Sequence, residues 1–227
     1  MTQEHQTRPG FLIPIPDPLL KGCRYIPLAQ QIPLPGGVIT IRSKPEQADA
    51  LFSSLAKSRE PFTMVLIGNP QTRPDGTLNL CQDGVLGIVS AQHTHDNGLV
   101  HTELLGVGRV HLGQPYLLEG EVLPRIDVEP PSDMTPTGGE QQRLEALVAQ
   151  FTEPLQDANM DFVHVLRHFA QEHQDTSLNL DRVANILAEH QPDVLQKFIE
   201  HKALDARLDL LQQLMSTLHE QISTYAE

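Results

Sequence analysis

Three side chains in the second half of the chain have a spacing that could hold a metal ion. His164 and His168 are four residues apart, and Glu172 follows four residues later. On a helix these positions share one face, and imidazole and carboxylate groups are ligands of zinc. A metal-dependent hydrolase is therefore one hypothesis. The adjacent Arg167 and the lack of an obvious further ligand favour a solvent-exposed helix face instead, so the sequence assigns no metal ligand.

Two other groups of residues have only part of the pattern of a site. His93 and His95 alternate on one side of a predicted strand just before a turn, and in a chain with eleven histidines such a pair indicates a solvated strand end. Gly106 and Gly108 have the spacing that opens a dinucleotide-binding loop. However, His111 stands where that loop needs its third glycine, and no helix is predicted to follow. The two glycines are more typical of a β-bulge.

The common catalytic motifs are missing from the sequence. A phosphate-binding P-loop requires a Gly-Lys pair, and none of the lysines follows a glycine. The sequence contains neither the Gly-x-Ser-x-Gly turn of serine hydrolases nor the His-Glu-x-x-His pair of zinc proteases. It therefore predicts no catalytic residue, no cofactor and no enzyme. It favours a recognition module, whose substrate-binding residues it does not identify.

Composition and charge narrow the classes of partner. The 227 residues carry a formal net charge of −13, which repels phosphate backbones and anionic lipids, so neither nucleic acid nor membrane is an expected partner. The first residues lack the basic and apolar regions of a signal peptide, and no run reaches the ~18 apolar residues of a membrane span. Cys23 and Cys81 are expected to be reduced thiols. Together these features indicate a cytoplasmic protein.

The first half of the chain predicts a small β-structure. Residues 1–24 alternate prolines with apolar residues and form an extended arm, either docked on a surface or partly ordered. Ser43 and Glu46 are typical of a capping box that opens one short helix, which ends at about Lys57. The Asn97-Gly98 pair predicts a hairpin with a type I′ turn. Short strands bounded by turn residues are predicted at 25–42 (two strands around a Pro-Gly segment), 62–67, 85–90, 100–105 and 116–122.

The second half of the chain predicts helices only. Residues 130–139 have the composition of a linker, and helical periodicity continues from 140 to 227. Pro154 is expected to kink or divide the first helical stretch, and Asn179 or Asp181 to cap a later helix. One apolar stripe is predicted to continue across that first stretch: Leu144, Leu147, Val148, Phe151, Leu155, Ala158, Phe162, Val165, Leu166 and Phe169.

The last helix carries a regular apolar seam at alternating steps of four and three residues. Such a seam can form a two-chain coiled coil, but short loops make sequential helices pack on each other. We therefore expect it to pack in its own bundle, in a monomer or a weak homodimer. The seam consists of Leu204, Leu208, Leu211, Met215, Leu218, Ile222 and Tyr225.

In their order along the chain, these segments resemble the N-terminal, substrate-binding domain of the Lon protease family, from about Tyr25 to Ser223. No single motif is diagnostic, but six follow one another in the family's order. They are the Pro-rich entry 26–39 with the helix from Pro45, the buried strand 62–67, the strand 84–89 with its Asp-Asn-Gly turn, the Gly-x-x-Arg segment 106–109, the leucine-alanine-aspartate helix 180–188, and the Asp-Ala-Arg-Leu run 205–211.

The resemblance implies an α+β fold. A PUA-like β pseudobarrel with one short helix would occupy residues 25–129, and a helical bundle 140–227 would follow the linker. It also implies a non-catalytic module that binds unfolded or tagged polypeptides and could act with a protease partner. Lon proteases continue into ATPase and Ser-Lys peptidase domains that this sequence lacks, so we expect a stand-alone relative or a fragment.

Small β-barrels also bind RNA, which leaves a PUA-like nucleic-acid-binding protein as the alternative function. The 16 lysines and arginines are scattered among 29 acidic residues, which counts against it.

Overall fold

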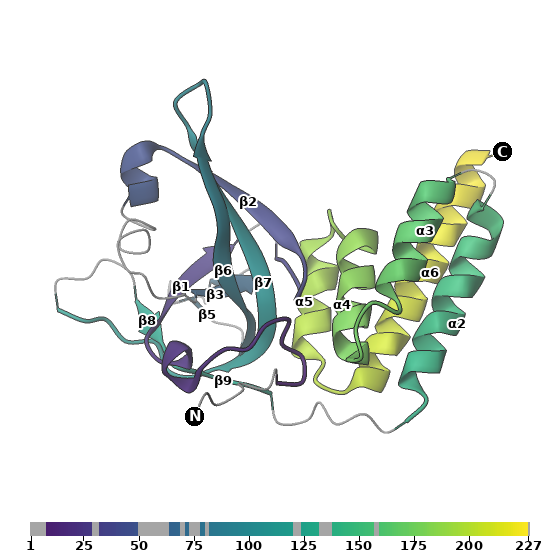
Figure 1. The fold of residues 1–227 in the computed structure, drawn as a ribbon, viewed down its shortest axis with the longest axis horizontal. Coiled ribbons are helices and arrows are strands. Elements are labelled where there is room, and N and C mark those ends of the chain that lie inside the picture. The colour runs from purple at the N-terminus through teal and green to yellow at the C-terminus, as the bar shows by residue number, and fades with distance from the viewer. Residues whose placement is uncertain are drawn as a thin grey trace, which may run out of the picture.

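The structure is a computed structural model, which describes residues 8–28, 32–49, 64–68, 71–72, 78–79, 82–119, 124–131, 138–156 and 159–226. A strongly curved, barrel-like β-sheet lies beside a group of helices (Figure 1). The strands come first in the chain and the helices last, which confirms the predicted α+β fold. Parts of the predicted elements fall outside the described residues. They are the start of the arm, residues 29–31 of the 25–42 segment, the helix beyond Asp49, residues 62–63 of strand 62–67, Cys81, residues 120–122 of strand 116–122, part of the linker and Ala158.

The main sheet combines antiparallel pairs with one parallel pair. Its hydrogen-bonded order is β2-β7-β6-β3-β1-β8, with β9 paired to β7, and only β1 and β3 run parallel. β-Branched and aliphatic residues dominate the long strands, as a pleated, half-buried surface favours. The strands are β1 (Cys23–Leu28), β2 (Val38–Ser43), β3 (Met64–Gly68), β4 (Gln71–Thr72), β5 (Leu78–Asn79), β6 (Asp83–Thr94), β7 (Val100–Leu112), β8 (Arg125–Ile126) and β9 (Val128–Glu129).

The β6–β7 hairpin is confirmed, but its turn differs from the predicted type. The strands end at Thr94 and resume at Val100. The Gly98 amide donates to the His95 carbonyl (2.8 Å), so Gly98 is the last residue of the turn rather than a central one. Its φ of 79° and the following bond between His95 and Leu99 fit a turn that closes through a glycine bulge.

The expected β-bulge at Gly106 and Gly108 is present and receives the N-terminal arm. Leu86 pairs with Gly108 while Gly87 pairs with Gly106, which leaves Val107 as the extra residue. The Val107 carbonyl accepts a hydrogen bond from the Leu12 amide (2.7 Å). A Cβ at Gly108 would lie 2.5 Å from the ring of Phe11, which is buried in the apolar core of the sheet. In the described residues, then, the arm is docked rather than loose.

A predicted strand over residues 116–122 is not found in the described part of that segment. Tyr116 makes one isolated bridge to Arg125, and Leu117 and Leu118 are both exposed. Two consecutive exposed apolar residues lack the alternation of a half-buried strand, which explains why pairing ends after one residue.

The helices form the second part of the molecule. They are α2 (Glu140–Thr152), α3 (Met160–Phe169), α4 (Thr176–Leu187), α5 (Pro192–Glu200) and α6 (Leu204–Ala226), preceded in the chain by the short η1 (Asp17–Leu20) and interrupted by η2 (Glu153–Leu155). None of the helices within the described residues is long and apolar enough to cross a membrane.

Pro154 divides the first helical stretch, as predicted, and this division changes which residues face inward. Residues 153–155 form η2, and α3 begins again at Met160, where Asn159 accepts a hydrogen bond from the Phe162 amide. Because the helical phase restarts, the single predicted stripe is wrong at Val165, which is 42% exposed, and Val163 is buried in its place.

The cap predicted for α4 was also wrong. Asp175 caps this helix by accepting a hydrogen bond from the Ser177 amide (2.8 Å). Asn179 and Asp181 lie inside the helix and are fully buried. Asn179 bonds both main-chain groups of His173 (2.8 Å each) and so holds the preceding loop.

The seam of α6 packs against the other helices over its first half. Leu204, Leu208, Leu211 and Met215 belong to one apolar core with residues of α2, α4 and α5. Ile222, near the end of the helix, is 44% exposed. Because Leu218 is partly buried against the same core, the preference for packing within one chain is confirmed as far as Leu218.

Candidate functional site

A buried ionic junction joins the sheet to the helices. Arg109 of β7 donates through Nε to Asp181 Oδ2 of α4 (2.9 Å) and through Nη2 to the other carboxylate oxygen, while its Nη1 donates to the Phe198 carbonyl of α5. Arg207 of α6 donates to Asp181 Oδ1 (3.1 Å) and to Ser177 Oγ (2.8 Å). One carboxylate thus holds guanidinium groups from two other elements.

The junction carries more positive than negative charge. Two guanidinium groups meet one carboxylate, and the side chains of Asp181 and Arg207 are at most 1% exposed. Burial, followed by the repulsion of Arg109, lowers the pKa of Arg207 to about 10, against the attraction of Asp181 and Asp175. The Nε of Arg207 is also buried without a hydrogen-bond partner among the described residues. A buried cluster of this kind contributes more to the relative orientation of β7, α4 and α6 than to the free energy of unfolding.

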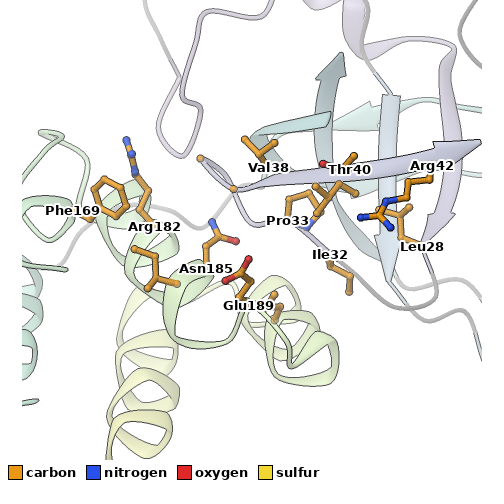
Figure 2. A pocket seen from close by; sticks show the side chains of 15 residues that line it. Leu28, Ile32, Pro33, Val38, Thr40, Arg42, Phe169, Arg182, Asn185 and Glu189 are labelled. Carbon is orange, nitrogen blue, oxygen red and sulfur yellow. The ribbon is translucent and has the colours of Figure 1, made fainter. Parts of the chain in front are cut away.

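A wide groove opens between β2 and α4, on the exposed side of the same helix (Figure 2). Its volume is about 830 Å³. We call it the β2–α4 groove. It is lined by Leu28, Ile32, Pro33, Gly36, Gly37, Val38, Ile39, Thr40, Arg42, Phe169, Arg182, Asn185, Ile186, Glu189 and Leu195.

The loop before β2 closes one end of the groove and is held by Asn185. The Leu34 amide donates to Asn185 Oδ1 (2.9 Å), and Nδ2 donates to the carbonyls of Leu34 (3.3 Å) and Pro35 (3.4 Å). A Cβ at Gly37 would lie 2.6 Å from Oδ1 of Asn185. Glycine is therefore required at position 37 for the loop to approach the helix this closely.

The β2 wall of the groove is partly apolar and open to solvent. Val38, Thr40 and Arg42 are exposed, whereas Ile39 and Ile41 are half-buried. Val38 is 56% exposed, which is unusual for a β-branched apolar residue beside a cavity. Figure 2 shows Val38 and Thr40 along β2, across from Asn185 of α4 and from Glu189, which lies just beyond the end of that helix.

The α4 wall combines a fixed cation with an exposed anion. The guanidinium of Arg182 lies 3.9 Å from the centre of the Phe169 ring and pairs with Glu172 (2.7 Å). Ile186 is half-buried, and Glu189 is exposed at the far end of the helix. The groove therefore offers apolar surface flanked by charges of both signs.

The structure does not bring the three candidate metal ligands together as a site. His164 and His168 are exposed on α3, and Glu172 lies 3.8 Å from His168 but only 2.7 Å from Arg182. The carboxylate is thus committed to a cation of the protein. No cluster of three or more metal-binding side chains occurs within the described residues.

His93 and His95 lie on the exposed hairpin end, as expected, but they have a third neighbour that the sequence analysis missed. The ring of His101 stacks on that of His95 (4.9 Å between centroids) and lies 5.4 Å from that of His93. Desolvation of the half-buried ring, followed by the charges of His95, Arg42 and His93, lowers the pKa of His101 below 6.5.

Sequence reasoning did not identify the ionic junction or the groove. Arg109, Asp181 and Arg207 each belong to one of the segments on which the family resemblance depends. Only Arg109 lies in a run of apolar residues and glycines, where a charged residue can signal a buried pair; Asp181 and Arg207 have charged neighbours in the sequence that hide this signal. The residues of the groove come from segments far apart in the chain and share no spacing.

Comparisons with known proteins agree with this architecture. No protein-family model matches the chain, and no curated protein matches it. Among solved structures, the N-terminal domain of a Mycobacterium avium complex Lon protease aligns with a TM-score of 0.65 and 14% identity, covering 86% of this chain and 98% of that one. A Lon N-terminal domain protein from Xanthomonas campestris aligns with a TM-score of 0.54 and 18% identity, covering 84% and 96%. The chain therefore has the fold of the Lon protease N-terminal domain, as the sequence resemblance predicts.

Proposed function

We propose that this chain is a non-catalytic module that recognises unfolded or tagged polypeptides, and that they bind in the β2–α4 groove. The observation that carries the proposal is the groove itself. It is wide, open to solvent and lined by both polar and apolar side chains from the two parts of the molecule, with Val38 exposed on its wall. Apolar surface exposed in an open groove supports an interaction site.

The arrangement suits a polypeptide better than a small molecule. Ligand pockets for small molecules enclose most of the ligand surface, whereas this groove is open along β2. The helices would serve as the scaffold that holds α4 opposite β2. The resemblance in fold to Lon N-terminal domains supports a role in substrate recognition.

Binding to an unfolded, acidic protein tests the proposal without non-specific charge attraction. Reduced and carboxymethylated α-lactalbumin, labelled with a fluorophore, should bind the wild-type chain in an anisotropy titration. Val38→Asp places a charge on the apolar wall and should weaken binding about tenfold, because a desolvated carboxylate opposes apolar contact.

Leu117→Asp is the matched control, since Leu117 is 63% exposed and does not line the groove. This variant should bind like the wild type. Absence of binding by the wild-type chain would overturn the function. Equal binding by Val38→Asp and the wild type would overturn the assignment of the site.

A further inference from the structure

We propose that the β2–α4 groove takes an extended polypeptide segment as an added strand on β2, with an acidic side chain of that segment beside Arg42. This inference rests on the proposed function and specifies how it is performed. Strand addition uses main-chain hydrogen bonds for affinity and side-chain contacts for selection.

Among the described strands, β2 is an edge strand of the main sheet. Within the described strands, β2 lies at one end of the hydrogen-bonded order and pairs with β7 alone. Its sequence, Val-Ile-Thr-Ile-Arg-Ser, is rich in β-branched residues and has no proline. Natural edge strands are usually protected by proline, bulges or several charges. β2 carries only Arg42 as a charged residue along this edge.

Alternate main-chain amides and carbonyls of β2 point away from β7. The Gly106 amide donates to the Gly37 carbonyl (2.9 Å), while the Gly36 amide donates to the Gly106 carbonyl (2.8 Å). Gly36 has a φ of 82°, so this is a glycine bulge that starts the ladder. Bonded pairs then alternate along an antiparallel ladder.

From that start, the residues bonded to β7 are Ile39, Ile41 and Ser43, which pair with Leu104, Thr102 and Val100. The amides and carbonyls of Val38, Thr40 and Arg42 consequently point away from β7. These three residues also line the groove. Main-chain donors and acceptors without a partner among the described residues therefore stand where an added strand would need them, with a repeat of two residues.

The charge of the groove wall favours an acidic segment. Arg42 is exposed on this wall and makes no ion pair with any residue that the structure describes. The other arginine of the groove, Arg182, is already paired with Glu172. In a chain with a net charge of −13, an exposed arginine that none of the described carboxylates neutralises favours an acidic side chain at the edge of β2.

The probe is the labelled peptide Glu-Val-Thr-Val-Thr-Val-Glu, which places a carboxylate near Arg42 in either strand direction. A matched peptide carries Lys at both ends. The wild-type chain should bind the Glu peptide more tightly than the Lys peptide in an anisotropy titration. Amide hydrogen exchange measured by NMR should be slower in the complex at Val38, Thr40 and Arg42. The exchange rates at Ile39 and Ile41 should not change.

Thr40→Pro removes one outward amide, and edge strands tolerate proline at such a position. Thr40→Ala is its control. Thr40→Pro should weaken binding of the Glu peptide at least about tenfold, and Thr40→Ala by less than about twofold. If Thr40→Pro does not fold, as judged by circular dichroism, the exchange measurement on the wild-type chain still decides.

Equal binding by the proline and alanine variants would overturn strand addition, as would unchanged exchange at the three outward amides. Amides of β2 that are protected in the free chain, and more so at higher protein concentration, would show a second copy at the edge and would also overturn it. Binding of unfolded α-lactalbumin together with either of these results would leave the proposed function standing.

Discussion

Helix α4 meets the sheet part of the molecule in two contrasting ways. At Asp181 the contact is a sealed ionic junction, in which one carboxylate holds arginines from β7 and α6 away from water. One turn later, at Asn185, the contact is a few hydrogen bonds at the end of an open groove. The first contact fixes the relative position of the two parts, and the second uses that position to present a surface.

Rigidity and openness are therefore supplied by different residues of one helix and of the turn that follows it. Within α4, Val183 and Ala184 face the helical core, Asp181 faces the junction, and Asn185 and Ile186 face the groove. Glu189 lines the groove from just beyond the end of the helix. Changes at the junction should therefore act on stability first. Changes in the groove should act on binding with smaller effects on stability. Four experiments test whether the junction and the groove can be separated in this way.

Asp181→Asn should have the largest effect. It leaves two buried guanidinium groups without the carboxylate that both of them contact, which typically costs ~3–5 kcal/mol of unfolding free energy. Urea unfolding followed by circular dichroism measures the loss. The matched control is Asp209→Asn, which removes an exposed partner of Arg143 and should cost less than ~1 kcal/mol. Equal unfolding midpoints for the two variants would contradict a sealed junction.

Asn185→Ala should have an intermediate effect on both stability and binding. It leaves the amide of the buried Leu34 without its acceptor, at a cost of about 1–3 kcal/mol. It also releases the loop that closes the groove. Glu189 lies just beyond the end of α4, on the same wall of the groove, and Glu189→Ala should leave stability within ~0.5 kcal/mol. A stability loss for Glu189→Ala as large as that for Asn185→Ala would remove the distinction between the two residues.

Arg207→Met should cost far less than Asp181→Asn, although it removes two hydrogen bonds. It deletes the excess positive charge and leaves Arg109 and Asp181 as a balanced pair. The expected change is within about 1 kcal/mol, because replacing a desolvated ion by an apolar side chain offsets much of the loss. Urea unfolding of Arg207→Met and Asp181→Asn under the same conditions compares the two losses of stability. Similar losses for both variants would mean that the number of bonds matters, not the balance of charge.

The smallest expected effect is the change in stability with pH that comes from His101. The pKa of His101 lies below 6.5, first through desolvation and then through the charges of His95, Arg42 and His93. Between 6.5 and that lower pKa the unfolded chain binds more protons than the folded chain, so stability declines as the pH falls through this window. An NMR titration of the His101 ring measures the pKa. Arg42→Ala and His95→Ala should each raise it, and an unchanged value in both would contradict the charge contribution.

Much of the fold could be predicted from the sequence because its signals are local. β-Branched runs between glycines and prolines predicted the long strands of the hairpin, and Pro154 predicted the division of the first helical stretch. Predictions were wrong where one local sequence pattern is compatible with two structures. Asp181 can cap a helix or pair inside one, and only the positions of Arg109 and Arg207 decide between them.

The groove and the junction could not be predicted in the same way. Their residues come from strands, loops and helices spread along the chain from Leu28 to Leu195 in the groove and from Arg109 to Arg207 in the junction, and no spacing rule connects them. The sequence by itself determined the order of strands and helices, the apolar seam of the last helix and the acidic charge of the chain, because these depend on neighbouring residues and on composition. Only the tertiary structure decided which charge lies in the dry interior and which strand edge stays open, because burial and pairing arise from segments that meet only when the chain has folded.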